Sequence, residues 1–277
     1  MIRPLNGSSL HADRELVACE LARLLDERTM PAGSPVHEAM RYAVLGAGQR
    51  LRPVMAVRVG RMAGAEAKYA LRAAAAVEIL HCASLVVDDL PCMDDEAMRR
   101  DRPAVHVQFG ESTALLASFG LVALAARAVV QDVEKSQAAR SVRFQIQLLK
   151  VLDCSGLIEG QALDLRLRGE SRDAQRDCLT ELKTVPLFQL AVEAGLAFGD
   201  APARMKTGLR QFARDFGLAY QMTDDLLDGE ESDPERLASQ YDRVRQRLSP
   251  FGAAACGLEE MLDYLHAKAD EKNYCHR

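Results

Sequence analysis

The sequence predicts an all-α fold, a single helical domain over residues 1–277. Ala, Leu and Arg, which are strong helix formers, are frequent, whereas aromatic residues make up 5% of the chain and Trp is absent. Residues 209–227 carry apolar side chains at spacings of three, four and seven, which is typical of an amphipathic helix. No alternating run is long enough to predict a sheet.

Prolines and glycines divide the chain into the predicted helices. Ser34 is the expected N-cap and Pro35 the first residue of one helix, which should end where Gly46 and Gly48 can adopt the left-handed conformation. Pro91 should stop a long Ala-rich helix. In chain order, we expect helices over residues 14–28, 35–45, 50–62, 71–90, 112–131, 138–155, 173–195 and 209–227, with an irregular stretch over 99–109.

Composition and charge exclude several classes of protein. With 48% hydrophobic residues the chain is not disordered, and with 35 Lys and Arg against 40 Asp and Glu it is not a broadly basic nucleic-acid binder. No stretch of 18 residues is apolar and free of charge throughout, so we expect no membrane span. The first ten residues lack a signal-peptide pattern, and the seven cysteines form no CxxC pair. These observations favour a cytoplasmic protein with free thiols.

An acidic cluster follows the apolar run at residues 79–87. It holds five carboxylates within nine residues, and we call it the first acidic cluster: Asp88, Asp89, Asp94, Asp95 and Glu96. Negative charge at a helix C-terminus opposes the helix dipole, and such local conflicts are frequent at functional sites. Carboxylates grouped in this way suit Mg²⁺, although a solvated acidic turn is the alternative.

A second acidic cluster, formed by Asp224, Asp225 and Asp228, ends the helix predicted over 209–227. Asp224 and Asp228 share one helix face, and Gln221 precedes them on that face. Two acidic clusters that each follow an apolar helix indicate a cavity in which metal ions bridge a diphosphate from both sides.

Basic and polar residues accompany the acidic clusters. Arg99, Arg100 and Arg102 follow the first cluster, and Arg50 and Arg52 follow the glycine turn. Their guanidinium groups suit phosphate oxygens, with salt bridges to the aspartates as the alternative. His81 lies seven residues before Asp88 and could face the same cavity or pack in the core. Four further polar residues can be assigned either way from the sequence: Gln161, Asp164, Lys183 and Thr184.

In these residues the chain resembles the trans-isoprenyl diphosphate synthases, which make farnesyl, geranylgeranyl and longer diphosphates. The resemblance runs over residues 36–228 and rests on several motifs in order: Ala39 to Tyr42 leading to Arg50 to Pro53, Glu78 to Leu85, Asp88 to Asp94 with Pro91 and Cys92 inserted, Met98 to Pro103 with His106, Gly160, Gln161 and Asp164, Lys183 and Thr184, and Gln221 to Asp228. It implies an all-α isoprenoid synthase bundle around a central cavity. It also implies a homodimer, or a hetero-oligomer with another synthase.

The resemblance implies a role for each matching residue. Asp88, Asp94, Asp224 and Asp228 would hold about three Mg²⁺ ions, directly or through water. Arg99, Lys183, Thr184 and Gln221 would hold an allylic prenyl diphosphate, and Arg52, His81 and Arg100 would hold isopentenyl diphosphate. The residues expected to be catalytic are Asp88, Asp89, Asp94, Asp224, Asp225 and Lys183.

The chain departs from the family pattern at four places. Gln49 replaces a lysine that contacts isopentenyl diphosphate, Val87 replaces a histidine, and Phe119 replaces a glycine–aspartate pair. The lysine-bearing loop and the helix after it are missing beyond Asp228, where the chain continues with residues 229–234. The C-terminal part is therefore expected to be shortened after about residue 228.

The sequence supports three hypotheses of function. The first is a Mg²⁺-dependent prenyltransferase that condenses isopentenyl diphosphate with an allylic diphosphate. The second is a non-catalytic or regulatory synthase subunit, and the third is a terpene cyclase-like enzyme that needs no isopentenyl diphosphate. Ala83 and Ser84 occupy the positions that resemble the family's chain-length gate. Because both are small, we expect a C20 product, geranylgeranyl diphosphate, and a C15 product would point to Phe119 as the wall.

Overall fold

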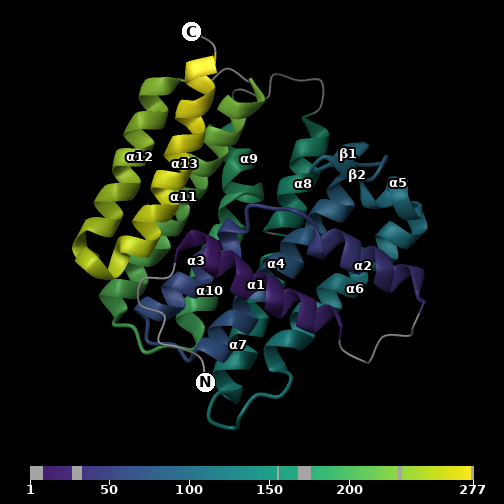
Figure 1. Cartoon of the computed structure of the whole chain (residues 1–277), viewed down its shortest axis with the longest axis horizontal. Helices are drawn as coiled ribbons and strands as arrows, with labels where there is room; N and C mark the ends of the chain where they lie inside the picture. Colours follow the sequence, from purple (N-terminus) through teal and green to yellow (C-terminus); the bar gives the residue numbers. More distant parts are fainter. Residues whose placement is uncertain (1–8, 27–32, 155, 168–175, 230–232, 276–277) are drawn as a thin grey trace.

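A computed structural model describes residues 9–26, 33–154, 156–167, 176–229 and 233–275. The described chain is a helical bundle in which the helix α4 (Ala67–Asp88) runs through the centre (Figure 1). The remaining helices in the first half are α1 (Leu10–Leu25), α2 (Pro35–Leu45), α3 (Leu51–Met62), α5 (Val105–Phe109) and α6 (Glu111–Val130). The second half contains α7 (Ala138–Lys150), α8 (Leu157–Arg166), α9 (Arg176–Lys183), α10 (Val185–Ala197), α11 (Ala203–Asp228), α12 (Pro234–Leu248), a 3₁₀ helix (Ser249–Ala255) and α13 (Cys256–Cys275).

The all-α prediction is confirmed, and α4 shows why the fold is helical. Its small alanines allow α3, α6 and α10 to pack closely on its sides, and Ala73–Ala76, Ile79 and Leu80 are each at most 1% exposed. The apolar stripe predicted on α11 is also buried, because Leu209, Phe212 and Phe216 have no exposed surface. Close packing of apolar side chains therefore holds the bundle together.

Several helix ends differ from the predictions. The helix α1 begins at Leu10 because Ser9 is its N-cap, with a side chain that accepts a hydrogen bond from the Ala12 N–H. The predicted cap at Ser34 is confirmed by its hydrogen bond from the His37 N–H. Residues 27–28, 155 and 173–175, where three predicted helices begin or end, lie outside the described residues.

The predicted left-handed glycines at the end of α2 are wrong. Gly46 has a φ of −69° and a ψ of 172°, and the left-handed residue is Arg50, with a φ of 53°. The glycines instead leave room for two arginines, because a Cβ on Gly46 would displace the guanidinium of Arg102 and one on Gly48 that of Arg100.

Two further elements correct the prediction. The helix expected over 173–195 is interrupted at Thr184, because Pro186 lacks an N–H and opens a new helix, α10. The stretch expected to be irregular contains a short antiparallel hairpin, β1 (Met98–Arg99) and β2 (Arg102–Pro103). Its turn residues Arg100 and Asp101 both have positive φ, 87° and 62°, as a tight hairpin turn requires.

The chain beyond Asp228 folds onto α11. The helices α12 and α13 lie side by side with α11 on one side of the molecule (Figure 1). Residues 230–232, which follow the second acidic cluster, lie outside the described residues. The sequence has no lysine between Gly229 and Ala267, and the first one, Lys268, is on α13.

By length and composition alone, α4 and α6 could cross a membrane. Each contains a charged residue within its apolar stretch, Glu78 in α4 and Arg127 in α6. Neither helix is therefore an apolar stretch free of charge. In α4, 67% of the apolar window is buried inside the fold, and in α6 44%. Because the central helix of a bundle meets the same criterion, this is weak evidence for a membrane span.

Candidate active site

The first acidic cluster forms where α4 ends and the chain turns. The Asp94 N–H donates to the carbonyl of Asp88 over 2.8 Å, so the turn folds back and brings the two aspartates together. The pKa of Asp88 is raised to about 6, mainly by burial, with Lys183 opposing the rise and the charges of Asp94 and Asp89 contributing to it. Such a carboxyl group is stabilised in its charged form by an added cation.

Asp89, which was expected to be catalytic, is paired with an arginine. It is 2% exposed, and it accepts hydrogen bonds from the guanidinium of Arg99, with 3.0 Å between Arg99 Nε and Asp89 Oδ1. Arg99 reaches it from β1. The tight hairpin therefore presents Arg99 beside the end of α4, and Asp89 holds it there.

A polar network on α8, α9 and α10 connects the two acidic clusters. Gln161 Nε2 donates to Asp94 over 3.4 Å, and Lys183 Nζ donates to Asp164 over 2.6 Å. The interruption between α9 and α10 falls at Thr184, whose buried hydroxyl donates to Gln221 Oε1 over 2.6 Å. Gln161, Lys183 and Thr184 were ambiguous in the sequence, and the structure brings them between the clusters.

The second acidic cluster occupies the last turns of α11. Gln221 Nε2 donates to Asp225 Oδ1 over 2.8 Å, as their spacing of four residues allows. Burial raises the pKa of Asp224, the nearby charges of Asp228 and Asp225 add to this, and Arg52 and Lys268 lower it. The cluster thus has crowded carboxylates with two cations nearby, and Asp228 lies exposed at its end.

A basic cleft of about 380 Å³ adjoins the second cluster. It is lined by the turn from Ala47 to Arg52, together with Glu78, His81, Arg100, Asp101 and Tyr220. Arg52 Nη1 lies 3.3 Å from His81 Nε2, and its guanidinium carbon lies 4.5 Å from the centre of the Phe188 ring. Burial and the charge of Arg52 lower the pKa of His81 well below its usual value, so the imidazole is neutral.

The neutral state of His81 fixes its hydrogen bonding. A guanidinium group can only donate, so Nε2 accepts from Arg52 and Nδ1 carries the proton. Within the described residues this Nδ1 atom is buried and has no hydrogen-bond partner. His81 therefore retains a donor but adds no positive charge to the cleft.

Two cations on the outer helices were missed by the sequence interpretation. Arg14 on α1 donates to the Gln49 carbonyl over 2.8 Å, and Lys268 on α13 acts on the pKa of Asp224. They lie far along the chain from the motifs, and no local pattern marks them. Lys268 is not part of the lysine-bearing loop that the sequence lacks after Asp228.

The residues expected to set product length lie on opposite sides of the α4–α6 contact. Ala83 is 1% exposed, and its carbonyl accepts a hydrogen bond of 3.0 Å from the Ser118 hydroxyl of α6. The next residue of α6, Phe119, is 65% exposed on the outer surface. The ring of Phe119 therefore does not form a wall within its own chain.

The carboxylates of the two acidic clusters suit a magnesium ion only if a bound ligand supplies further oxygen atoms. Within the described ranges, no three His, Cys, Asp or Glu side chains lie close enough to hold a metal ion by themselves. Oxygen donors arranged on two sides of an opening, with raised pKa values at Asp88 and Asp224, fit hard cations that also take phosphate oxygens.

Comparison with known proteins identifies the family. The family model described as polyprenyl synthetase matches residues 34–241. The chain is 38% identical over 220 residues to geranylgeranyl pyrophosphate synthase 4 of Arabidopsis thaliana, covering 77% of this chain and 58% of that protein. It is 34% identical over 215 residues to a chloroplastic geranylfarnesyl diphosphate synthase of Leucosceptrum canum, covering 76% and 59%. The chain thus spans under three fifths of the length of these curated relatives.

Solved structures agree with this assignment. The crystal structure of a geranyltransferase from Legionella pneumophila superposes with a TM-score of 0.88 at 30% identity, covering 94% of this chain and 96% of that one. An FPP/GFPP synthase from Zymomonas mobilis has a TM-score of 0.83 at 32% identity, covering 92% and 98%. The chain belongs to the polyprenyl synthetase family.

Proposed function

We propose that the protein is a prenyltransferase that condenses isopentenyl diphosphate with an allylic prenyl diphosphate. The observation that carries this proposal is the set of polar residues between the clusters: the charge of Lys183 acts on Asp88 of the first cluster, and the adjacent Thr184 donates to Gln221, which donates to Asp225 of the second. Two aspartate clusters with a cation and two neutral donors between them fit a diphosphate leaving group.

In the proposed reaction, the residues between the clusters stabilise charge on the leaving diphosphate. Lys183 and Arg99 offer charged donors, and Thr184 and Gln221 offer neutral donors. The allylic C–O bond breaks with its electron pair on the diphosphate. The double bond of isopentenyl diphosphate then attacks the allylic cation, and a proton passes to the released diphosphate. The apolar side chains of the bundle exclude water from the cation.

We propose Mg²⁺ as the cofactor, about three ions, held by Asp88, Asp94, Asp224 and Asp228 with the diphosphate. Bound there, the metal ions would neutralise charge on the leaving group. Isopentenyl diphosphate would bind in the basic cleft, which is lined by Arg52, Arg100 and the neutral His81.

One assay tests this function. Purified protein is incubated with Mg²⁺ and farnesyl diphosphate, with and without isopentenyl diphosphate, and the products are measured by mass spectrometry. Elongation only in the presence of isopentenyl diphosphate supports the proposal. A cyclic product without isopentenyl diphosphate would favour the terpene cyclase-like alternative.

We propose geranylgeranyl diphosphate as the end product. The small side chains of Ala83 and Ser84 on α4 support this proposal, and two of the relatives are named as makers of geranylgeranyl and geranylfarnesyl diphosphate. Replacing Ala83 with Phe should shorten the product to C15, because the ring would stop the growing chain. A wild-type C15 product, or an unchanged product in Ala83→Phe, would contradict this proposal.

A subunit role is the second candidate, and Gln49 favours it because the change from lysine removes a cation from the basic cleft. One similar protein, 35% identical, is named heterodimeric geranylgeranyl pyrophosphate synthase large subunit 2 in Arabidopsis thaliana. If the purified chain alone makes no product but changes the product of an active synthase when mixed with it, this second function applies.

We also propose that the chain forms a homodimer through α6 and α7. Both helices carry exposed apolar side chains at helical spacing: Leu115, Leu116 and Phe119 on α6, and Val142, Ile146 and Leu149 on α7, which are 43 to 65% exposed. Such a patch is typical of a protein interface. Light scattering should give twice the mass of the chain, and Phe119→Glu should give the monomer mass.

A further inference from the structure

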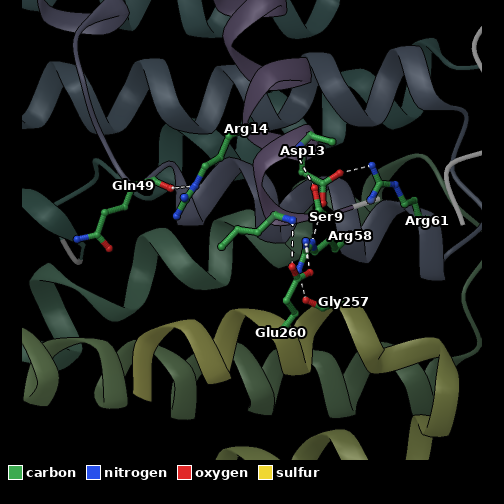
Figure 2. Close-up of polar contacts among 10 residues, drawn as sticks. Ser9, Asp13, Arg14, Gln49, Arg58, Arg61, Gly257 and Glu260 are labelled. Carbon is green, nitrogen blue, oxygen red and sulfur yellow. Dashed lines mark hydrogen bonds and ion pairs between the residues drawn. The ribbon is translucent and has the colours of Figure 1, made fainter. Parts of the chain in front are cut away.

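The turn that borders the basic cleft is held by an arginine from the first helix. Arg14 of α1 donates through Nε to the Gln49 carbonyl over 2.8 Å, and the close-up shows its guanidinium directed at that carbonyl (Figure 2). The two residues are 35 positions apart in the chain. We propose that Arg14 is a positioning residue for the isopentenyl diphosphate subsite, an inference that rests on the proposed function.

The backbone at this turn needs external support. Arg50, directly after Gln49, has a φ of 53°, and it is the N-cap of α3 without a side-chain cap. A non-glycine residue in this conformation persists only when its surroundings hold it. Because Arg52 follows in the first turn of α3, a shift at Gln49 would move the arginine that faces the cleft.

The charge of Arg14 is not neutralised by a carboxylate within the described part of the chain. Its guanidinium carbon lies 4.7 Å from the centre of the Tyr264 ring of α13, and its Nη2 atom is buried without a hydrogen-bond partner. A cation therefore remains beside the backbone of Gln49, the residue that replaces the family's lysine. In the low dielectric of the protein interior this charge adds to the attraction of the cleft for a diphosphate.

Arg14 is not required to anchor α1, because its neighbour Asp13 does this. Asp13 is fully buried and accepts hydrogen bonds from Arg58 and Arg61, and Arg58 also donates to Glu260 over 2.7 Å (Figure 2). These arginines have carboxylate partners, as expected of side chains that stabilise the fold. Arg14 differs from Arg58 and Arg61 because its partner is a backbone carbonyl at the cleft and not a carboxylate.

The test compares Arg14→Gln and Arg14→Met with the wild type. We expect the KM for isopentenyl diphosphate to rise about tenfold in both variants, with the KM for the allylic substrate unchanged. The reason is that the lost charge-assisted hydrogen bond supports the isopentenyl diphosphate subsite and not the allylic one. Arg14→Lys, which retains the charge and a donor, should recover most of the affinity. Arg23→Gln on the exposed side of α1, where Arg23 pairs with Glu20, is the matched control and should change neither KM.

Calorimetric binding of isopentenyl diphosphate separates this inference from the proposed function. If the wild type makes no product but binds isopentenyl diphosphate about tenfold more tightly than Arg14→Gln, the positioning role stands and the activity is refuted. Equal affinities of wild type and both variants would overturn the positioning role. Equal rises in the KM of both substrates, or no recovery in Arg14→Lys, would assign Arg14 a general structural role and overturn it as well.

Discussion

The two sides of the active site use their cations differently. Between the acidic clusters, the cations are engaged by carboxylates, Lys183 with Asp164 and Arg99 with Asp89. In the basic cleft, Arg50 also pairs with a carboxylate, that of Glu78, but Arg52 contacts a neutral imidazole and the face of an aromatic ring. An anion can therefore bind directly to the basic cleft, whereas the clusters first need added cations. Under the proposed function, the two diphosphates would therefore be recognised by different physical means.

The largest expected effect is on the cluster side. Asp88→Ala and Asp224→Ala should each reduce elongation by about a thousandfold or more, because each removes a carboxylate from a site that binds diphosphate through cations. Binding of a non-hydrolysable allylic analogue should lose its Mg²⁺ dependence. Asp263→Asn, on the exposed surface of α13, is the control. If either alanine variant keeps its Mg²⁺ dependence, the two-cluster site is wrong.

Removal of the metal should separate the two sides. With EDTA in place of Mg²⁺, we expect the affinity for the allylic analogue to fall about a hundredfold, whereas the affinity for isopentenyl diphosphate should change less than about threefold. Calorimetric titration of each ligand measures this. A similar loss of affinity for both ligands would show that the basic cleft also depends on metal ions. The two sides of the site would then not differ in how they bind a diphosphate.

The charge of the basic cleft can be raised by one substitution. Gln49→Lys should lower the apparent KM for isopentenyl diphosphate by about one to two orders of magnitude, because a charge-assisted hydrogen bond contributes roughly 1.5–3 kcal/mol. The KM for the allylic substrate should stay unchanged. If Gln49→Lys affects neither elongation nor isopentenyl diphosphate binding, the cleft is not used in this way. The subunit or cyclase alternative then gains support.

The smallest expected effect concerns the stability of the metal-free protein. Burial raises the pKa of Asp88 to about 6, so between pH 4 and 6 the folded state binds more protons than the unfolded state. Stability therefore falls as the pH rises through this range. Asp88→Asn should remove this loss and raise the free energy of unfolding at pH 7.5 by about 1–2 kcal/mol, since the side chain is only partly shielded from water.

Denaturant titrations of the metal-free protein at pH 4 and pH 7.5 measure this effect. The wild type and Asp88→Asn should differ at the higher pH and converge at the lower one. Asp263→Asn should follow the wild type at both values. A wild type that is more stable than Asp88→Asn at pH 7.5 would show that the buried charge of Asp88 does not destabilise the metal-free protein.

Much of the fold was predictable because it depends on local signals. Ser34 with Pro35 specified the start of α2, and the apolar spacing over 209–227 specified the buried face of α11. The composition of the Ala-rich segment likewise predicted a helix, which proved to be the central α4. These features depend on residues within a few positions of one another, and so sequence patterns contain them.

The rest depends on partners that are distant in the sequence. Gly46 and Gly48 were expected to supply a left-handed turn, but the guanidinium groups of Arg100 and Arg102, more than 50 positions away, explain the glycines. The burial of Asp89 against Arg99 also requires the hairpin, whose turn of two non-glycine residues has no strong sequence signal. The cluster pattern predicts where a candidate site lies, and contacts between residues distant in the sequence decide how its side chains are paired.

The buried ion pairs around Asp13 have a consequence for how the chain folds. Leu10 donates its N–H to Glu260, 250 positions later, and Arg58 needs both Asp13 and Glu260 to compensate its charge. During synthesis, the first helix therefore cannot complete its polar contacts until the last helix has left the ribosome. Contacts of this separation form late, since the entropy of closing so long a loop must be overcome first. A nascent chain that stalls before α13 would keep Asp13 and Arg58 only partly compensated and exposed to chaperones and proteases.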